Sequence, residues 1–218
     1  ATNDASGVRT LREAMGHVAY HSPQLYRGIY LSSGLSFGMQ SAGYDFQSLA
    51  ARHPDDAILA MPYQGVGFSL GAGLIIHSSS WFLGLSAPHI LEQDLGSLNP
   101  LSREKRHLYA TLGYIHPLNK MVDLRLVSLV KWTGNAPAIM EVNLECWLFE
   151  ILSVGAMMRW REGLGIQASY QFIEGWRFHY AIDFPTNGLM TRSFGSHEVG
   201  LAWDFGRRSM AFQSPRYF

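Results

Sequence analysis

The residue types of a hydrolase site stand side by side at Ser196-His197-Glu198. This stretch lies in a segment whose apolar and polar residues alternate as in a β-strand, where successive side chains point to opposite faces. His197 therefore points away from both Ser196 and Glu198, and the three groups cannot form the hydrogen-bonded relay of nucleophilic catalysis. The sequence predicts no catalytic residue, and we expect a protein that is not an enzyme.

Other motifs that could bind a nucleotide or a metal are equally weak evidence of such a site. The glycine pairs in Gly65-Val66-Gly67 and Gly71-Ala72-Gly73 are similar to nucleotide-binding loops, but no strand-to-helix transition follows them. The 9 histidines are scattered without the spacing of metal ligands, and the single cysteine, Cys146, cannot form an internal disulfide. We therefore expect neither a metal nor a cofactor.

The composition excludes several classes of protein. The 17 Lys+Arg and 17 Asp+Glu give a formal net charge of +0, which removes the simplest case for a nucleic-acid partner. Hydrophobic residues make up 47% of the chain and charged residues 16%, so the chain is too apolar to be disordered. No window approaches the roughly 18 consecutive apolar residues of a membrane helix. The first residues lack a signal segment, so we expect any targeting signal to have been removed or to lie upstream.

The period of the apolar residues predicts β-strands. From residue 150 onward the alternation is regular, with strands near 152–160, 164–172, 176–184 and 198–205. The same pattern, less regular, predicts strands near 12–20, 28–46, 65–77, 80–88, 106–117, 121–133 and 137–148. About eleven strands joined by turns, with no helix, indicate an all-β antiparallel up-and-down meander, either a sandwich or a barrel.

The connections between these strands favour a membrane barrel. Those near 77–80, 118–120, 149–150 and 173–175 are short and share one end of the sheet, whereas the long stretches 47–64 and 88–105 lie at the other end. Outer-membrane barrels have short periplasmic turns and long extracellular loops. An odd count of about eleven strands would start the chain outside the cell, so we expect strands to be missing from the front of a barrel of about fourteen. Residues 1–206 would then form the C-terminal part of the barrel, and 207–218 a periplasmic tail.

The alternation predicts that one face of the strands contacts water in the lumen and the other contacts lipid. A wet lumen would be lined by Glu141, Glu145, Arg159, Arg161, Gln167, Arg177, Asp183, Glu198 and Asp204. The lipid would contact Ile166, Ala168, Tyr180, Ile182 and Leu201. Aromatic rings prefer headgroup depth, and they gather at the strand ends as a predicted girdle of Trp160, Tyr170, Phe172, Trp176, Phe184, Trp203 and Phe205. A sandwich core would also use alternation, but it would not bury so polar a second face.

Several segments resemble the PorP/SprF family: WFLGLSAPHILE at 81–92, LSFGMQ at 35–40, GYDF at 43–46, GSHEVGL at 195–201 and SPRYF at 214–218. The resemblance runs over most of the chain in the expected order. It implies a β-barrel in the bacterial outer membrane that belongs to the type IX secretion system of Bacteroidota. The implied roles are protein export, surface attachment of exported proteins and gliding motility. The implied partners are other secretion-system components and adhesin-type cargo.

A second, narrower resemblance concerns the last strand. Glu198, Gly200, Trp203 and Phe205 have the spacing of the assembly signal that ends many outer-membrane barrels. Any lipid-facing last strand that ends in aromatic residues would approximate this spacing, so the match is supportive only.

Two other functions remain open from the sequence. A polar lumen would suit a passive pore or a small-solute transporter, and a soluble β-sandwich could act as a binding module.

The predicted lipid face can be tested with arginine substitutions. Ile166→Arg or Leu201→Arg should destabilise the folded protein by about 2–4 kcal/mol if these positions lie near mid-bilayer. Gln167→Arg and Ala202→Arg, on the opposite face, should have much milder effects. Denaturant unfolding in lipid bilayers measures the free energy of unfolding of all four variants. Equal destabilisation by substitutions on both faces would contradict the assignment.

Overall fold

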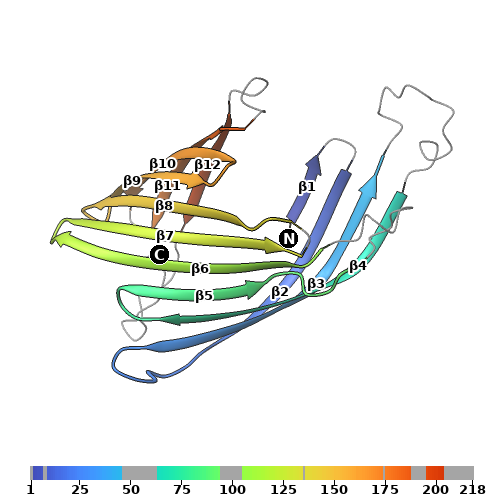
Figure 1. Cartoon of the computed structure of the whole chain (residues 1–218), viewed down its shortest axis with the longest axis horizontal. Helices are drawn as coiled ribbons and strands as arrows, with labels where there is room; N and C mark the ends of the chain where they lie inside the picture. The colour runs from blue at the N-terminus through green and yellow to red at the C-terminus, as the bar shows by residue number, and fades with distance from the viewer. Residues whose placement is uncertain are drawn as a thin grey trace.

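A computed structural model of the chain describes residues 2–6, 9–45, 63–93, 105–134, 136–173, 175–187 and 195–203. The strands are β1 (Thr2–Ser6), β2 (Arg9–His21), β3 (Tyr30–Tyr44), β4 (Tyr63–His77), β5 (Trp81–Ala87), β6 (His107–Asn119), β7 (Val122–Thr133), β8 (Ile139–Leu148), β9 (Leu152–Arg159), β10 (Gly163–Ile173), β11 (Trp176–Pro185) and β12 (Ser196–Trp203). They form one 12-stranded sheet in the order β1 to β12 (Figure 1). The predicted all-β antiparallel meander is confirmed.

The sheet has one strand more than the sequence predicts. The additional strand, β1, pairs with β2 from Thr2 opposite Glu13 to Ser6 opposite Arg9. Its residues are mostly polar and do not alternate, so no period signals it. Because the count of 12 strands is even, the argument for an odd number of further strands loses its premise. Among the described residues β1 and β12 do not pair with each other, so the sheet is open.

The two ends of the sheet differ as predicted. At one end, here the short-turn end, tight connections join β4 to β5, β6 to β7, β8 to β9 and β10 to β11. Between β8 and β9 the Ile151 amide donates to the Leu148 carbonyl over 3.0 Å, and Phe149 and Glu150 both have positive φ. This turn geometry matches the right-handed twist of the flanking strands. The opposite end, here the long-loop end, carries the connections from β3 to β4 and from β5 to β6.

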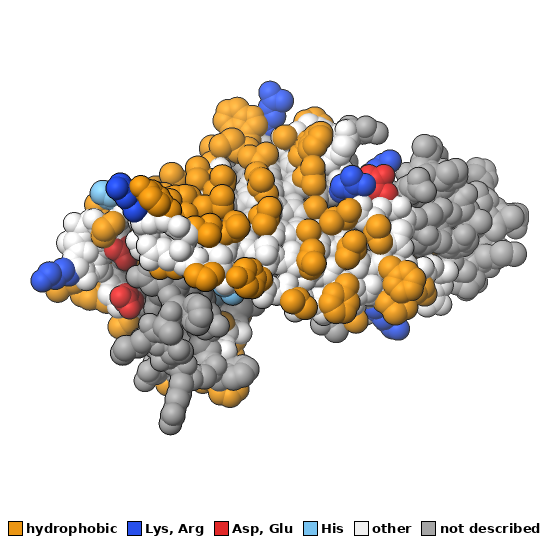
Figure 2. All heavy atoms as spheres, turned by 90° about the horizontal axis from the view of Figure 1, so that it is seen from below, with side chains coloured by type: hydrophobic (Ala, Val, Ile, Leu, Met, Phe, Trp, Pro, Cys, Tyr) orange, Lys and Arg blue, Asp and Glu red, His pale blue; other side chains and the backbone are white. Residues whose placement is uncertain are grey.

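Side-chain burial is inverted relative to a soluble protein. Among the described residues the only buried hydrophobic side chains are Ala42 and Trp147, whereas the buried polar ones are Ser32, Gln40, Ser69, His77, Arg125, Ser153 and Ser169. The apolar residues lie on the other face and are exposed, as with Ile166 at 57% and Leu201 at 62%. Figure 2 shows apolar side chains spread over the sheet, with most charged groups at its margins.

We name the apolar face the outer face and the polar face the inner face. A single sheet can bury polar side chains only if it curves around them, and Figure 1 shows that curvature. No second protein layer covers the outer face in the part of the chain that the structure describes. This arrangement differs from a sandwich, in which the apolar faces of two sheets pack together. The described residues also include no helix with the length and hydropathy needed to span a membrane.

Close packing of β2 against β3 gives a test of the inner face. A Cβ at Gly38 would overlap the Ala14 carbonyl oxygen and lie 2.8 Å from the Met15 Cα. Because these are backbone atoms, Gly38→Ala should destabilise the fold by about 1–3 kcal/mol. At Gly34 on the same strand the nearest atom would be the Val18 carbonyl oxygen at 3.7 Å. Gly34→Ala should therefore change stability by less than about 0.5 kcal/mol. Urea unfolding in detergent micelles compares the two, and equal effects would refute the packing argument.

Candidate functional site on the inner face

An ion-pair ladder crosses the inner face near the long-loop end. It consists of Lys131 on β7, Glu141 on β8, Arg159 on β9, Glu162 in the following turn and Asp183 on β11. Glu141 lies directly opposite Arg159 in the register. Arg159 Nε donates to Glu141 Oε2 over 3.0 Å, and Lys131 Nζ lies 3.7 Å from the same oxygen. Arg159 also lies 3.7 Å from Glu162 Oε2 and 3.8 Å from Asp183 Oδ2.

The ladder depends on a glycine in the strand between its members. Arg159 and Asp183 belong to β9 and β11, so their contact must pass over β10. Gly165 of β10 lies opposite Asp183, and a Cβ there would lie only 2.5 Å from Asp183 Oδ1. The missing side chain therefore leaves room for the two charged groups to meet, and ion pairs connect strands that are not neighbours in the sheet.

A second group, the arginine–tryptophan cluster, lies near the short-turn end and consists of Arg125, Glu145, Trp147, Ser153, Ser169 and Arg177. The guanidinium carbon of Arg125 lies 3.9 Å from the centroid of the Trp147 ring, and that of Arg177 lies 5.1 Å from it. Trp147 Nε1 and Ser153 Oγ each donate to the Glu145 carboxylate over 2.6 Å. The hydroxyls of Ser153 and Ser169 are themselves 2.6 Å apart.

Residues 88–93, here the strap, follow β5 and fold against β4. The Ile90 amide donates to the Leu70 carbonyl over 2.7 Å, and the Phe68 amide donates to Gln93 Oε1 over 2.9 Å. Gln93 Nε2 also donates to the Phe68 carbonyl. The Gln93 side chain thus replaces the strand partner that β4 lacks at this point, since the pairing of β4 with β5 stops at Ala72.

The strap also brings His89 to a serine and a glutamate. His89 Nδ1 lies 2.8 Å from Ser69 Oγ and 3.8 Å from Glu13 Oε1. A catalytic relay would need the serine and the carboxylate on different ring nitrogens, whereas both approach Nδ1 here. We interpret these contacts as a tether that holds the strap on the inner face. The described residues contain no group of three or more His, Cys, Asp or Glu that could hold a metal ion.

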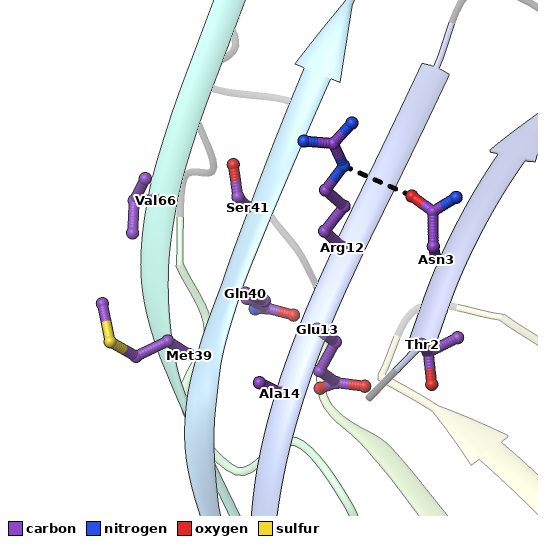
Figure 3. Close-up of a pocket in the computed structure, with 9 residues that line it drawn as sticks. All are labelled: Thr2, Asn3, Arg12, Glu13, Ala14, Met39, Gln40, Ser41 and Val66. Atoms are coloured by element: carbon purple, nitrogen blue, oxygen red, sulfur yellow. Dashed lines mark hydrogen bonds between the residues drawn. The ribbon is translucent and has the colours of Figure 1, made fainter.

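An open pocket of about 560 Å³ lies where β1 pairs with β2 (Figure 3). Arg12 Nε donates to Asn3 Oδ1 over 3.3 Å at its rim. The lining includes Met39 from the outer face and Gln40 from the inner face. The walls of the pocket come from both faces, so it does not belong to the inner face alone. We interpret it as the space beside β2 where the short strand β1 begins.

The structure brings some of the predicted lumen residues together and separates others. Glu141, Arg159 and Asp183 join in the ladder, and Glu145 and Arg177 in the cluster. Strand alternation puts Gln167 and Glu198 on the inner face, outside both groups. Arg161 lies in the exposed turn after β9 with a φ of 64°, so no strand directs it inward. Asp204, with the girdle residue Phe205, lies outside the described residues.

The predicted lipid residues, and the girdle residues that the structure describes, lie on the outer face. Ile166 pairs with Ile182, Ala168 with Tyr180, and Phe178 with Leu201. The Trp176 and Trp203 rings stack with centroids 5.4 Å apart, and the large exposed aromatic residues include Trp160, Tyr170, Phe172, Phe184 and Trp203. His197 is also on this face, where its Nδ1 lies 2.8 Å from the Tyr180 hydroxyl. Contact of these residues with lipid stays a prediction.

Sequence reasoning missed Arg125 and the uncharged members of the cluster, as well as the strap. Alternation puts Trp147 on the polar side of β8 with Glu141 and Glu145, and a large aromatic residue among inward polar ones is a signal that could have been used. Ser153 and Ser169 carry no such signal, because small polar residues are common on that face. The strap follows a strand that ends early, which the alternation in 80–88 does not reveal.

A family model described as type IX secretion system membrane protein PorP/SprF matches residues 1–203. No curated protein matches the chain.

Proposed function

The chain belongs to the PorP/SprF family of type IX secretion system membrane proteins, and on this premise we propose that it helps to export cargo proteins or to attach them to the cell surface through protein contacts. The family is one of secretion-system membrane proteins and not of enzymes. The all-β antiparallel meander fits an outer-membrane protein.

One observation carries the membrane part of this proposal: from β2 to β12 the outer face is apolar, and none of the residues that the structure describes covers it. Exposed residues include Phe68 on β4 and Val199 on β12, at 66% and 67%. Monomeric soluble proteins rarely expose a continuous apolar surface of such extent. In a bilayer the same surface would contact hydrocarbon, and the backbone groups between strands are already paired in the sheet.

The protein contacts of the proposed role belong to the two ends of the sheet. Cargo would bind at the long-loop end, and other secretion-system components at the short-turn end and the tail 207–218. Much of both long loops, 46–62 and 94–104, lies outside the described residues, as does the tail. The strap is the larger described part of the second loop, and its bonds to Phe68, Ser69 and Leu70 hold residues 89–93 against β4.

A passive pore is the second candidate, because the inner face carries the ion-pair ladder and other polar groups. Conductance separates the two functions. The purified protein reconstituted in liposomes should give no steady open channel if it acts through protein contacts. A steady conductance, which a water-filled lumen would produce, would favour the pore and contradict the proposed role.

The strap provides a residue-level test of the cargo role. A Cβ at Gly71 would overlap Ser36 Oγ and lie 2.5 Å from the Pro88 carbonyl oxygen, so Gly71→Ala should push the strap off β4. At Gly73 the nearest atom would be Ser86 Cβ at 3.5 Å, an ordinary contact. We expect Gly71→Ala to reduce surface-attached cargo severalfold in cells and Gly73→Ala to leave it unchanged.

Surface labelling of an adhesin-type cargo protein measures the effect, with heat-modifiable gel mobility as the control for barrel assembly. Wild-type amounts of surface cargo in cells that lack this protein would refute the proposed role. Equal cargo levels in the two glycine variants would refute the part assigned to the strap.

A further inference from the structure

Arg125 is a buried cation without the partners that such a group normally has. The residue is 6% exposed, and its Nε has no hydrogen-bond partner. No carboxylate oxygen of a described residue lies within 4.0 Å of its guanidinium nitrogens. Burying a charged group without such compensation is costly. The Trp147 ring, 3.9 Å away, interacts with the face of the guanidinium, which leaves the N–H donors in its plane free.

The nearest carboxylate is directed elsewhere. Glu145 lies opposite Arg125 in the register of β7 and β8. Its two oxygens accept from Trp147 Nε1 and Ser153 Oγ, both over 2.6 Å. Asp123, two residues before Arg125 on the same face, forms no ion pair among the described residues. Glu145 and Asp123 thus make the electrostatic potential at Arg125 more negative without binding its guanidinium group.

A second guanidinium lies at the same ring. Arg177 reaches Trp147 from β11, with its guanidinium carbon 5.1 Å from the ring centroid, and it forms no ion pair within the described part of the chain. Arg125 and Arg177 therefore bring two positive charges to one indole on the inner face. Guanidinium groups bind carboxylate and phosphate oxygens through paired N–H donors, and stacking on an aromatic ring keeps them in position for this.

We propose that the arginine–tryptophan cluster is a binding site for an oxyanion, either the carboxylate of a peptide or a phosphate group, with Arg125 as the main donor and Arg177 as the second. The cluster lies on the inner face near the short-turn end, so its ligand would come from that side of the sheet. It uses residues that the proposed export role does not need, and its test is independent of cargo.

Calorimetric titration of the full chain in detergent micelles at low chloride tests the site with two probes, succinate and inorganic phosphate. We expect about one binding site per chain for at least one probe. Binding of succinate alone assigns the site to carboxylates, and binding of phosphate alone assigns it to phosphate groups. Failure of both probes to bind would overturn the proposal, whatever the outcome for export.

Three variants locate the binding. Arg177→Gln should weaken it by about tenfold or more, a loss of roughly 1.4 kcal/mol, and this half-buried position avoids the folding risk of changing Arg125. Glu145→Gln should tighten binding, because it removes a negative charge beside the site. Arg161→Gln, in the exposed turn at the opposite end, should leave the affinity unchanged. Equal affinity in Arg177→Gln, or weaker binding in Glu145→Gln, would refute the assignment.

Discussion

The structure depends on one constraint: a single layer of strands must satisfy two different surroundings with its two faces. Because side chains alternate along a strand, every apolar residue turned outward requires a neighbour turned inward. The outer face accordingly carries Phe68, Ile166 and Leu201, and the inner face carries Ser69, Gln167 and Ala202. Hydrogen bonds between neighbouring strands pair the backbone N–H and C=O groups within the sheet. Side chains on the two faces therefore do not have to bond these backbone groups.

The inner face therefore contains groups that a soluble core would exclude. Charged side chains there are compensated across strands, as Glu141 is by Lys131 and Arg159. Glycine makes some of these contacts possible, because Gly165 leaves space over β10 for Asp183 to approach Arg159. Where compensation is incomplete, as at Arg125, the structure holds a group that suits a ligand. Polar groups with partners thus form a structural part of the inner face, and those without partners form the proposed binding site.

The two ends of the sheet also differ in how the chain is held. At the short-turn end, tight turns such as that at Phe149 and Glu150 join the strands directly. At the long-loop end the chain leaves the sheet after Ala87, and the strap returns to β4 through Gln93 and His89. A strap bonded to β4 at this end of the sheet is a suitable base for a protein-binding surface, which is why the proposed cargo contacts belong there.

The sequence by itself determined the all-β meander, the short-turn end and the two faces, because a period of two is a local property that needs no knowledge of distant residues. It also suggested the family through segments such as 81–92. It could not reveal β1, whose polar residues do not alternate, nor the strap. Only the tertiary structure decided which inward residues meet. Arg125 and Arg177 are 52 positions apart in the sequence. Pairing of β7 with β8 places Arg125 at Trp147, and curvature of the sheet from β8 to β11 brings Arg177 to the same ring.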